Sequence, residues 1–314
     1  MDSEDEGRRL DNHLLRVCKG VPKSHVYRII RSGEVRLNGK RAAASDRIRA
    51  GDLLRIPPVR LAQGQAEIVA GAEIRADLPI VHEDEALLVV DKPAGLAVHG
   101  GSGVNFGVIE ALRRQRPQAR FLELAHRLDR DTSGLLIVAR KRSALTVLHG
   151  MFRESGGAQG IDKRYLLLVR GRWMDPLRKV RLPLVKYRDA AGERRVRVAP
   201  DGKASHTVFR LLARWEHCSL LEAELRTGRT HQIRVHCAHL GFPIAGDEKY
   251  GDFEWNRSLS KAGLRRMFLH AWKIRLLHPV SGEALELTAR LPAALRGFLD
   301  CLSTKETAEY GQAL

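Results

Sequence analysis

Aromatic residues, cysteines and long apolar runs are all scarce in this chain. Phe, Trp and Tyr make up 5% of its 314 residues, which argues against an extended platform of stacked bases along an open sheet. Apolar runs fall well short of the roughly 20 residues that span a bilayer. The acidic opening MDSEDEG also differs from the basic start of a signal peptide. We therefore expect a cytoplasmic protein with no membrane partner.

The spacing of cysteines and histidines gives no indication of a metal centre. The cysteines are scattered, without the C-x-x-C pair of a zinc or redox site. They are Cys18, Cys218, Cys237 and Cys301. His231, His236 and His239 lie five and three residues apart without a matching carboxylate, so we interpret them as substrate-facing or hydrogen-bonded side chains. No metal site is predicted.

The chain instead carries a large excess of positive charge. Its 54 Lys and Arg residues outnumber 37 Asp and Glu residues, which gives a formal net charge of +17. Such an excess favours a polyanionic partner, because binding releases the counterions of that partner. Nucleic acid is the leading candidate, and an anionic membrane surface is the second.

The positive charge is concentrated near the N-terminus. Residues 1–7 are acidic and lack apolar anchors, so we expect a disordered tail. Residues 8–60 contain fourteen Lys and Arg against four Asp and Glu, interleaved with apolar residues at helical spacing. Within them a helix is predicted from Lys23 to Ser32, ending at Gly33, and an Asn-Gly turn follows between short strands. The pattern indicates two or three helices against a small sheet.

The segment VPKSHVYRIIRSGEVRLNGK resembles the S4 RNA-binding module. The resemblance implies that basic residues on its helix and adjoining turn contact RNA phosphates, which position RNA without reading its sequence. The side chains concerned are Lys23, Arg28, Arg31 and Arg36. A solvated basic helix face remains the alternative interpretation.

A second, larger domain is predicted beyond a linker. Residues 61–77 are rich in Ala, Gly and Gln without periodicity, which is typical of a linker. Residues 78–302 then alternate apolar runs with tight turns, and helical patterns occur only near residues 108–114, 144–153 and 233–240. This arrangement predicts an α+β protein whose second domain has a mixed, largely antiparallel sheet. We expect residues 303–314 to form a frayed tail.

The most informative stretch is HRLDRDTSGLLIVAR, residues 126–140. A polar segment there runs directly into the apolar strand LLIVA, so Asp129 should lie on a loop just before a buried strand. Such a loop holds a catalytic carboxylate rigidly. Taken alone, the same residues fit an ordinary turn whose carboxylates cap backbone N–H groups equally well.

The motif HRLDRDTSG closely resembles the central motif of the RluA family of pseudouridine synthases. VVDKPAGLAVH, KRYLLLVRG, RTGRTHQIRVH and GFPIAGDEKYG occur in the order that this family shows, and the resemblance spans roughly residues 80–290. It implies a pseudouridine synthase catalytic domain that isomerises uridines of large-subunit (23S) ribosomal RNA or its precursor. It also implies that no cofactor is needed, since uracil leaves and returns without redox chemistry.

The resemblance assigns three catalytic residues. Asp129 matches the essential aspartate of the family, and Arg234 matches the arginine that pairs with it. A cation is needed there because a dry pocket penalises a charged carboxylate, and a guanidinium suits the pairing better than an ammonium. Tyr165 matches the tyrosine whose ring packs on the target base. A core position on a strand is the alternative for Tyr165.

Three more residues are implied to contact RNA or to support the loop. Arg127 resembles the arginine that some relatives insert into the RNA stack after the target nucleotide flips out, although a structural salt bridge would also explain it. Arg229 is a candidate for a backbone phosphate. His126 should orient the loop rather than transfer protons.

Two other functions remain open at this point. One is a catalytically silent RNA-binding or ribosome-assembly factor that uses the same surfaces. The other is a metal-dependent nuclease built from Asp129, Asp131 and His126, although acidic ligands are sparse around that motif. The preferred interpretation is the isomerase, acting as a monomer on ribosomal RNA.

Overall fold

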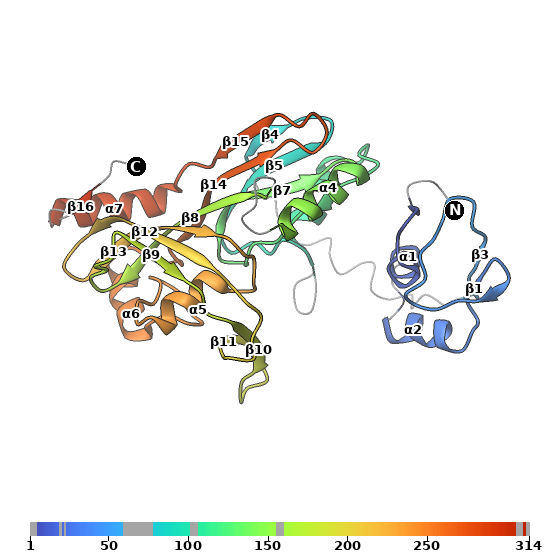
Figure 1. The fold of residues 1–314 in the computed structure, drawn as a ribbon, viewed down its shortest axis with the longest axis horizontal. Coiled ribbons are helices and arrows are strands. Elements are labelled where there is room, and N and C mark those ends of the chain that lie inside the picture. The colour runs from blue at the N-terminus through green and yellow to red at the C-terminus, as the bar shows by residue number, and fades with distance from the viewer. Residues whose placement is uncertain are drawn as a thin grey trace. The chain divides into compact units, whose positions relative to one another are not determined.

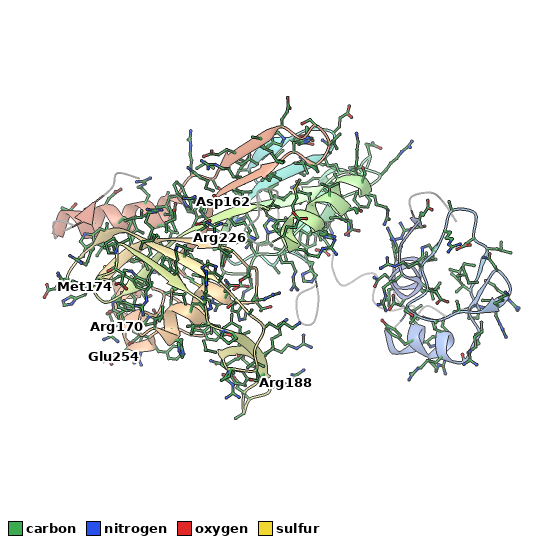
Figure 2. All side chains as sticks on the ribbon, viewed as in Figure 1. Asp162, Arg170, Met174, Arg188, Arg226 and Glu254 are labelled. Carbon is green, nitrogen blue, oxygen red and sulfur yellow. The ribbon has the colours of Figure 1, made fainter. Side chains whose placement is uncertain are left out.

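The computed structural model describes residues 5–18, 21, 23–58, 78–100, 106–154, 160–305 and 310–311. The chain divides into two compact units, Met1–Ile74 and Arg75–Leu314 (Figure 1). The predicted linker, residues 61–77, lies outside the described residues. Charged side chains cover the outside of the larger unit, as Figure 2 shows for Arg170, Arg188 and Glu254.

The N-terminal unit consists of two helices and a small antiparallel sheet. The helices are α1 (Leu10–Val17) and α2 (Lys23–Arg31), and the strands are β1 (Arg36–Leu37), β2 (Lys40–Arg41) and β3 (Leu54–Arg55), in the order β2-β1-β3. Leu10, Leu14 and Ile29 pack in its core. Asn38 and Gly39 join β1 to β2 with φ of 50° and 76°, which a two-residue hairpin turn requires. The predicted arrangement of helices against a small sheet is therefore confirmed.

The acidic start of this unit is more ordered than the sequence indicates. Asp5 is buried, and its Oδ1 lies 2.7 Å from Nη2 of Arg16 on α1. The Gly7 N–H donates to the carbonyl of Ile48 at 2.8 Å. The expectation of a disordered tail over residues 1–7 is therefore wrong for residues 5–7, because the ion pair with Arg16 of the following helix offsets part of the cost of ordering them. Residues 1–4 lie outside the described part.

The larger unit is built on one sheet, of eleven strands among the described residues. Its strands are β4 (Ile80–Glu83), β5 (Leu87–Lys92), β6 (Glu123–Leu124), β7 (Ser133–Ala139), β8 (Asp162–Arg170), β9 (Leu177–Val180), β12 (Thr207–Arg214), β13 (Cys218–Leu225), β14 (Leu269–Leu277), β15 (Ala284–Thr288) and β16 (Tyr310–Gly311). The order along the sheet is β16-β12-β13-β8-β14-β7-β5-β4, and β15, β6 and β9 pair with β14, β7 and β12.

Only the pairing of β7 with β14 is parallel among the described strands; the other pairings are antiparallel. The prediction of a mixed, largely antiparallel sheet is confirmed. A separate hairpin of β10 (Leu184–Arg188) and β11 (Arg194–Val198) projects from this unit (Figure 1).

Helices pack against the sheet and bury its central strands. They are α3 (Val108–Gln115), α4 (Arg142–Arg153), α5 (Gln232–His239), α6 (Phe253–Lys261) and α7 (Ala293–Lys305). Every residue of β7 is buried, so both faces of the sheet are covered there. The helices α3, α4 and α5 match the three predicted stretches, whereas α6 and α7 were not predicted. None of the helices in the described parts is long and apolar enough to cross a membrane.

The C-terminal segment also differs from expectation. The helix α7 continues to Lys305, and β16 pairs with β12 through Tyr310 and Gly311. A frayed tail over residues 303–314 is therefore wrong for these positions. Backbone pairing with an available strand edge orders a segment whose side chains show no periodicity.

Gly134 occupies the tight junction where β7 leaves its preceding loop. Its φ is +112°, and a Cβ at this position would lie 2.2 Å from the carbonyl oxygen of Ala271 on β14. A side chain therefore cannot be accommodated without separating the only parallel pair in the described sheet.

We expect Gly134→Ala to destabilise the larger unit by about 3 kcal/mol or more, because it adds backbone strain to a backbone clash. Gly150→Ala is the matched control, since a Cβ there meets nothing within 4 Å. In the helix α4 that control should be neutral or stabilising by up to ~1 kcal/mol. Urea unfolding of both variants checks the difference, and equal stabilities would contradict it.

Candidate active site

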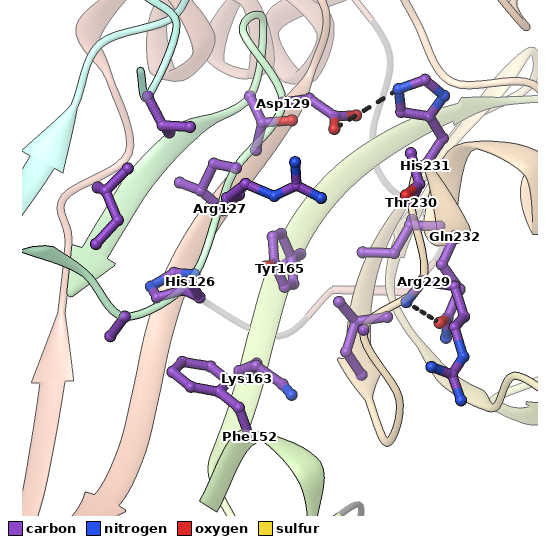
Figure 3. A pocket seen from close by; sticks show the side chains of 18 of the residues that line it. His126, Arg127, Asp129, Phe152, Lys163, Tyr165, Arg229, Thr230, His231 and Gln232 are labelled. Carbon is purple, nitrogen blue, oxygen red and sulfur yellow. Dashed lines mark hydrogen bonds and ion pairs between the residues drawn. The ribbon is translucent and has the colours of Figure 1, made fainter. Parts of the chain in front are cut away.

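A cavity of about 950 Å³ opens beside the loop that precedes β7. Segments distant in the sequence line it, among them residues 124–129, the end of α4, the start of β8, and residues 228–234 at the start of α5 (Figure 3). The structure brings Asp129, Tyr165 and Arg234 together on this cavity, together with His126, Arg127 and Arg229. All six site residues predicted in the larger unit therefore face one space.

The centre of the site is a chain of two carboxylates joined by one guanidinium. Nη1 of Arg234 donates to Oδ2 of Asp129 at 2.8 Å. Its Nε and Nη2 donate to the two carboxylate oxygens of Asp247 at 2.7 and 2.8 Å. The exposed fraction is 7% for Arg234 and 1% for Asp247, whereas the side chain of Asp129 is 28% exposed and faces the cavity.

The buried pair is held in its charged form. Burial opposes the charge on Arg234, but the two carboxylates raise the pKa of this guanidinium above its ordinary value. Burial would likewise raise the pKa of Asp247, but Arg234 and the N–H groups of Tyr250 and Lys249 hold that pKa below its usual range. Asp247 thereby fixes the orientation of the guanidinium, so that Nη1 of Arg234 points at Asp129.

Tyr165 forms part of the cavity wall beneath Asp129. It lies on β8 with 8% of its surface exposed, and its ring stands between Arg127 and Lys163 in Figure 3. Burial and the charge of Asp129 both raise the pKa of its phenol, so it stays protonated at physiological pH. A neutral, flat ring in this position can pack on a planar ligand.

His231 is a second neighbour of Asp129, and its place beside this carboxylate was not predicted from the sequence. Its Nε2 lies 3.8 Å from Oδ1 of Asp129, and its Nδ1 lies 2.8 Å from the hydroxyl of Tyr250. That hydroxyl accepts from the N–H of Val196, which leaves its proton for Nδ1 and favours a proton on Nε2 facing Asp129. Burial lowers the pKa of His231, so the ring is neutral. Its φ of 54° is unusual for a residue other than glycine and aims the ring at the site.

Lys92 stabilises the loop that carries Asp129 through hydrogen bonds to backbone carbonyls. This lysine is fully buried, and its Nζ donates to the carbonyls of Pro93, Leu96 and Arg130 at 2.9, 2.8 and 2.9 Å. Burial lowers the pKa of Lys92 to about 7. The available sequence signal was a lysine at the end of the strand pattern LLVVDK, close behind the apolar run LLVV.

His126 supports the loop from the opposite side. Its Nε2 accepts from the N–H of Ile137 at 3.0 Å, and its ring lies 4.9 Å from that of Phe152. Burial lowers the pKa of His126 to about 3, so the ring is neutral. This geometry supports the loop-orienting role expected for His126, and it leaves Nε2 committed to the backbone rather than to a metal.

The basic residues at the cavity rim are exposed. Arg127 faces the cavity from the catalytic loop (Figure 3). Arg229 donates through Nε to the carbonyl of Ala204 at 3.1 Å, and its N–H donates to Gln232 at 2.9 Å. Both guanidinium groups retain further N–H groups that an RNA phosphate can accept from.

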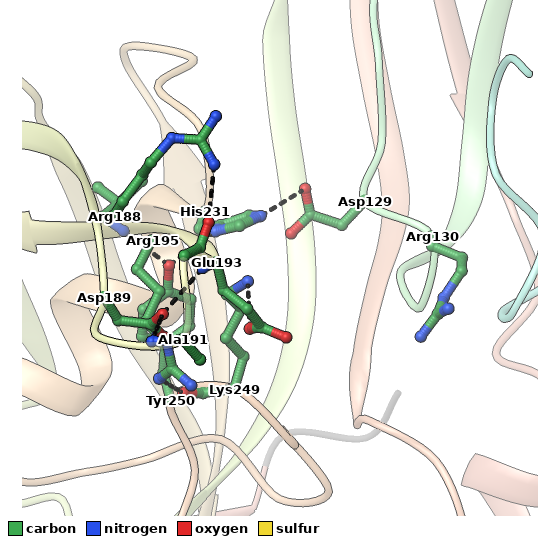
Figure 4. A network of polar contacts seen from close by, with 12 residues as sticks. Asp129, Arg130, Arg188, Asp189, Ala191, Glu193, Arg195, His231, Lys249 and Tyr250 are labelled. Carbon is green, nitrogen blue, oxygen red and sulfur yellow. Dashed lines mark hydrogen bonds and ion pairs between the residues drawn. The ribbon is translucent and has the colours of Figure 1, made fainter. Parts of the chain in front are cut away.

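A polar network ties the β10–β11 hairpin to the segment that holds Arg234 (Figure 4). Asp189 accepts from Nε of Arg195 at 2.6 Å, and Nη1 of Arg195 donates to the carbonyl of Lys249 at 2.8 Å. Tyr250, next in the chain, accepts from Val196 on β11. The hairpin thus braces residues 247–250 against the centre of the site.

The other predicted positions have separate surroundings. Arg28, Arg31 and Arg36 are exposed on the N-terminal unit, while the side chain of Lys23 lies outside the described part. His236 is buried between Ser205 and Thr207, with a pKa lowered to about 4 by burial. Among the residues that the structure describes, no group of three His, Cys, Asp or Glu side chains could hold a metal ion.

Comparison with known proteins identifies related sequences over nearly the whole chain. A family model described as RNA pseudouridylate synthase matches residues 86–239, and the S4 domain matches residues 8–54. The ribosomal large subunit pseudouridine synthase C of Pasteurella multocida is 49% identical over 310 residues, which cover 98% of this chain and 94% of the relative. The protein of that name from Escherichia coli (strain K12) is 49% identical over 306 residues, covering 96% and 94%.

Two solved structures resemble the larger part of the chain. Human RNA pseudouridylate synthase domain containing 1 has a TM-score of 0.60 at 26% identity, covering 76% of this chain and 91% of its own. Human RNA pseudouridylate synthase domain containing 4 has a TM-score of 0.59 at 27% identity, covering 74% and 94%.

The buried pair of Arg234 and Asp247 predicts a defined loss of stability. Asp247→Asn removes one charge while leaving the guanidinium buried, so unfolding free energy at pH 7 should fall by about 3 kcal/mol. Asp175→Asn is the control, because Asp175 is 53% exposed in its 3.4 Å ion pair with Arg178. That change should cost at most ~0.5 kcal/mol.

The same ion pair predicts how the free energy of unfolding depends on pH. The pKa of Asp247 is lower in the folded than in the unfolded chain, so its stabilisation is complete above the unfolded value, about 4, and is lost as pH falls through the folded value. Urea unfolding from pH 7 to pH 3 should show a smaller decline for Asp247→Asn than for the wild type. Parallel curves would contradict this assignment.

Proposed function

This chain belongs to the RNA pseudouridylate synthase family, and from that premise we propose that it isomerises selected uridines of large-subunit ribosomal RNA, with Asp129 as the essential catalytic carboxylate. The observation that carries the proposal is the 2.8 Å contact between Asp129 and Arg234 at the edge of the cavity. Large-subunit ribosomal RNA is the substrate class of the 49% identical relatives, ribosomal large subunit pseudouridine synthases C.

The isomerisation needs few catalytic groups. The bond between C1′ of ribose and N1 of uracil breaks, the ring turns, and C5 bonds to C1′; C5 loses a proton and N1 gains one. Neither an oxidant nor a water nucleophile takes part, so one charged carboxylate can serve as nucleophile or as base. The guanidinium of Arg234 donates to Asp129 and holds this carboxylate at the cavity wall.

The cavity fits an everted nucleoside. Its volume of about 950 Å³ exceeds that of one nucleoside, and bases must leave the helical stack before their sugar bond can be reached. Tyr165 is placed to pack on the uracil ring. Arg127, exposed on the loop that carries Asp129, can stack in the space that the base vacates, and Arg229 can bind a backbone phosphate.

The N-terminal unit would bind the backbone of the same RNA. Its match to the S4 domain and its exposed residues Arg28, Arg31 and Arg36 support binding to phosphates. Contacts of this kind position a structured RNA and leave the choice of uridine to RNA shape and single-stranded loops.

Replacing the catalytic carboxylate should separate chemistry from binding. We expect Asp129→Asn to lower the single-turnover rate of pseudouridine formation by about 10⁴-fold, while the Kd for ribosomal RNA fragments changes less than about threefold. Asp175→Asn should retain the wild-type rate. Activity should persist in EDTA.

This experiment also addresses the two rival functions. Product from Asp129→Asn at the wild-type rate would reject the catalytic assignment, and a wild-type protein that binds RNA without forming product would support a silent binding factor. Strand scission that requires Mg²⁺ would support a nuclease.

The N-terminal unit is tested through salt dependence. Arg28→Gln combined with Arg31→Gln should weaken binding of large-subunit RNA and reduce the slope of log K against log salt by about 0.7–0.9 for each phosphate that the variant no longer neutralises. Arg296→Gln, on the exposed face of α7, is the control. An unchanged slope in the double variant would place these arginines outside the RNA interface.

A further inference from the structure

A buried lysine faces the catalytic cavity and has no part in the roles assigned to Asp129, Arg234 and Tyr165. Lys163 lies two residues before Tyr165 on β8, so both side chains project from the same face of the strand. Its surface is 8% exposed, yet it lines the cavity, and Figure 3 shows its ammonium group beyond Tyr165 from Asp129.

This ammonium group has no polar partner among the described residues. The nearest carboxylate in sequence, Asp162, accepts from Nε and Nη2 of Arg164 at 3.1 and 3.0 Å. The Nζ of Lys163 instead lies 5.4 Å from the ring centroid of Phe152, whose other ring neighbour, His126, is neutral. Burial lowers the pKa of Lys163 accordingly. A cation on a mostly buried side chain that opens on the cavity can be stabilised by a ligand there that supplies an acceptor.

The position of the Lys163 ammonium group deep in the cavity narrows the choice of ligand. Arg127, Arg153 and Arg229 are exposed cations on the same cavity, and the phosphates of a bound RNA remain at such a rim. The part of an everted nucleotide that enters furthest is its base. Since Tyr165 is placed to pack on that base, the adjacent position on the same strand face meets the edge of the ring.

We propose that Lys163 is a further catalytic residue, whose ammonium group donates to a carbonyl oxygen of the everted uracil and stabilises the ring while it is detached. The inference rests on the proposed isomerase function. When the C1′–N1 bond breaks, its electron pair leaves with uracil, and the negative charge spreads over N1, O2 and O4. A fixed ammonium group stabilises that charge without giving up its proton, and the charge disappears when C5 bonds to C1′.

The test combines variants of Lys163 with atom changes in the RNA. Single-turnover rates are measured on an RNA fragment with one mapped target that is uridine, 2-thiouridine or 4-thiouridine, since sulfur accepts hydrogen bonds poorly. Lys163→Met should lower the rate on uridine by about 10²- to 10³-fold with little change in RNA Kd. One of the two thio substitutions should slow the wild type and have no further effect on the variant.

Two controls keep the result specific. Lys261→Met, on an exposed position of α6 outside the cavity, should keep the wild-type rate and both thio effects. Lys163→Met should unfold thermally at or above the wild-type temperature, because it replaces a buried charge by an apolar side chain of similar length.

Three outcomes would overturn the proposal. In the first, Lys163→Met reacts within threefold of the wild-type rate. In the second, Lys163→Met is slow but each thio substitution still slows it as it slows the wild type. In the third, Lys163→Met instead becomes insensitive to a methylphosphonate at a phosphate that flanks the target. The last outcome would assign Lys163 to the RNA backbone. A wild type that forms no pseudouridine would reject the isomerase function itself, which this series distinguishes from failure of the lysine assignment.

Discussion

The site depends on one guanidinium shared between two carboxylates. Arg234 must stay charged in a place that is 7% exposed, and it does so because Asp247 binds it through both oxygens. An arginine with Asp129 as its sole partner could turn toward solvent, whereas Asp247 fixes the plane of the guanidinium so that Nη1 points at Asp129. The position of Asp129 at the cavity therefore depends on the buried pair of Arg234 and Asp247.

The surrounding fold supplies what this pair requires. Lys92 binds the carbonyl of Arg130 from beneath the catalytic loop, and His126 accepts from the buried strand that follows it. The hairpin of β10 and β11 reaches the residues beside Asp247 through Arg195 and Val196. Lys92, His126 and the hairpin thus hold the two segments that meet in the 2.8 Å contact between Asp129 and Arg234. The parallel pairing of β7 with β14 fixes the buried strand that follows the catalytic loop.

Much of this could be predicted from the sequence because the relevant signals are local. The polar run that ends in LLIVA placed Asp129 before a buried strand, and family resemblance paired it with Arg234, 105 residues further along the chain. Asp247 and Lys92 were missed, since their roles arise from contacts between distant segments that no spacing rule encodes. Order at Asp5 and at Tyr310 was missed for the same reason: one depends on a cation of α1, the other on a strand edge.

The central claim is that the charge at residue 129 performs the isomerisation on ribosomal RNA. Carbodiimide and primer-extension mapping of large-subunit RNA tests it most directly, in a strain that lacks the gene and is complemented with the wild type or with Asp129→Ala. The account predicts pseudouridine at discrete positions that only the wild type restores. Restoration by both proteins, or by neither, would contradict it.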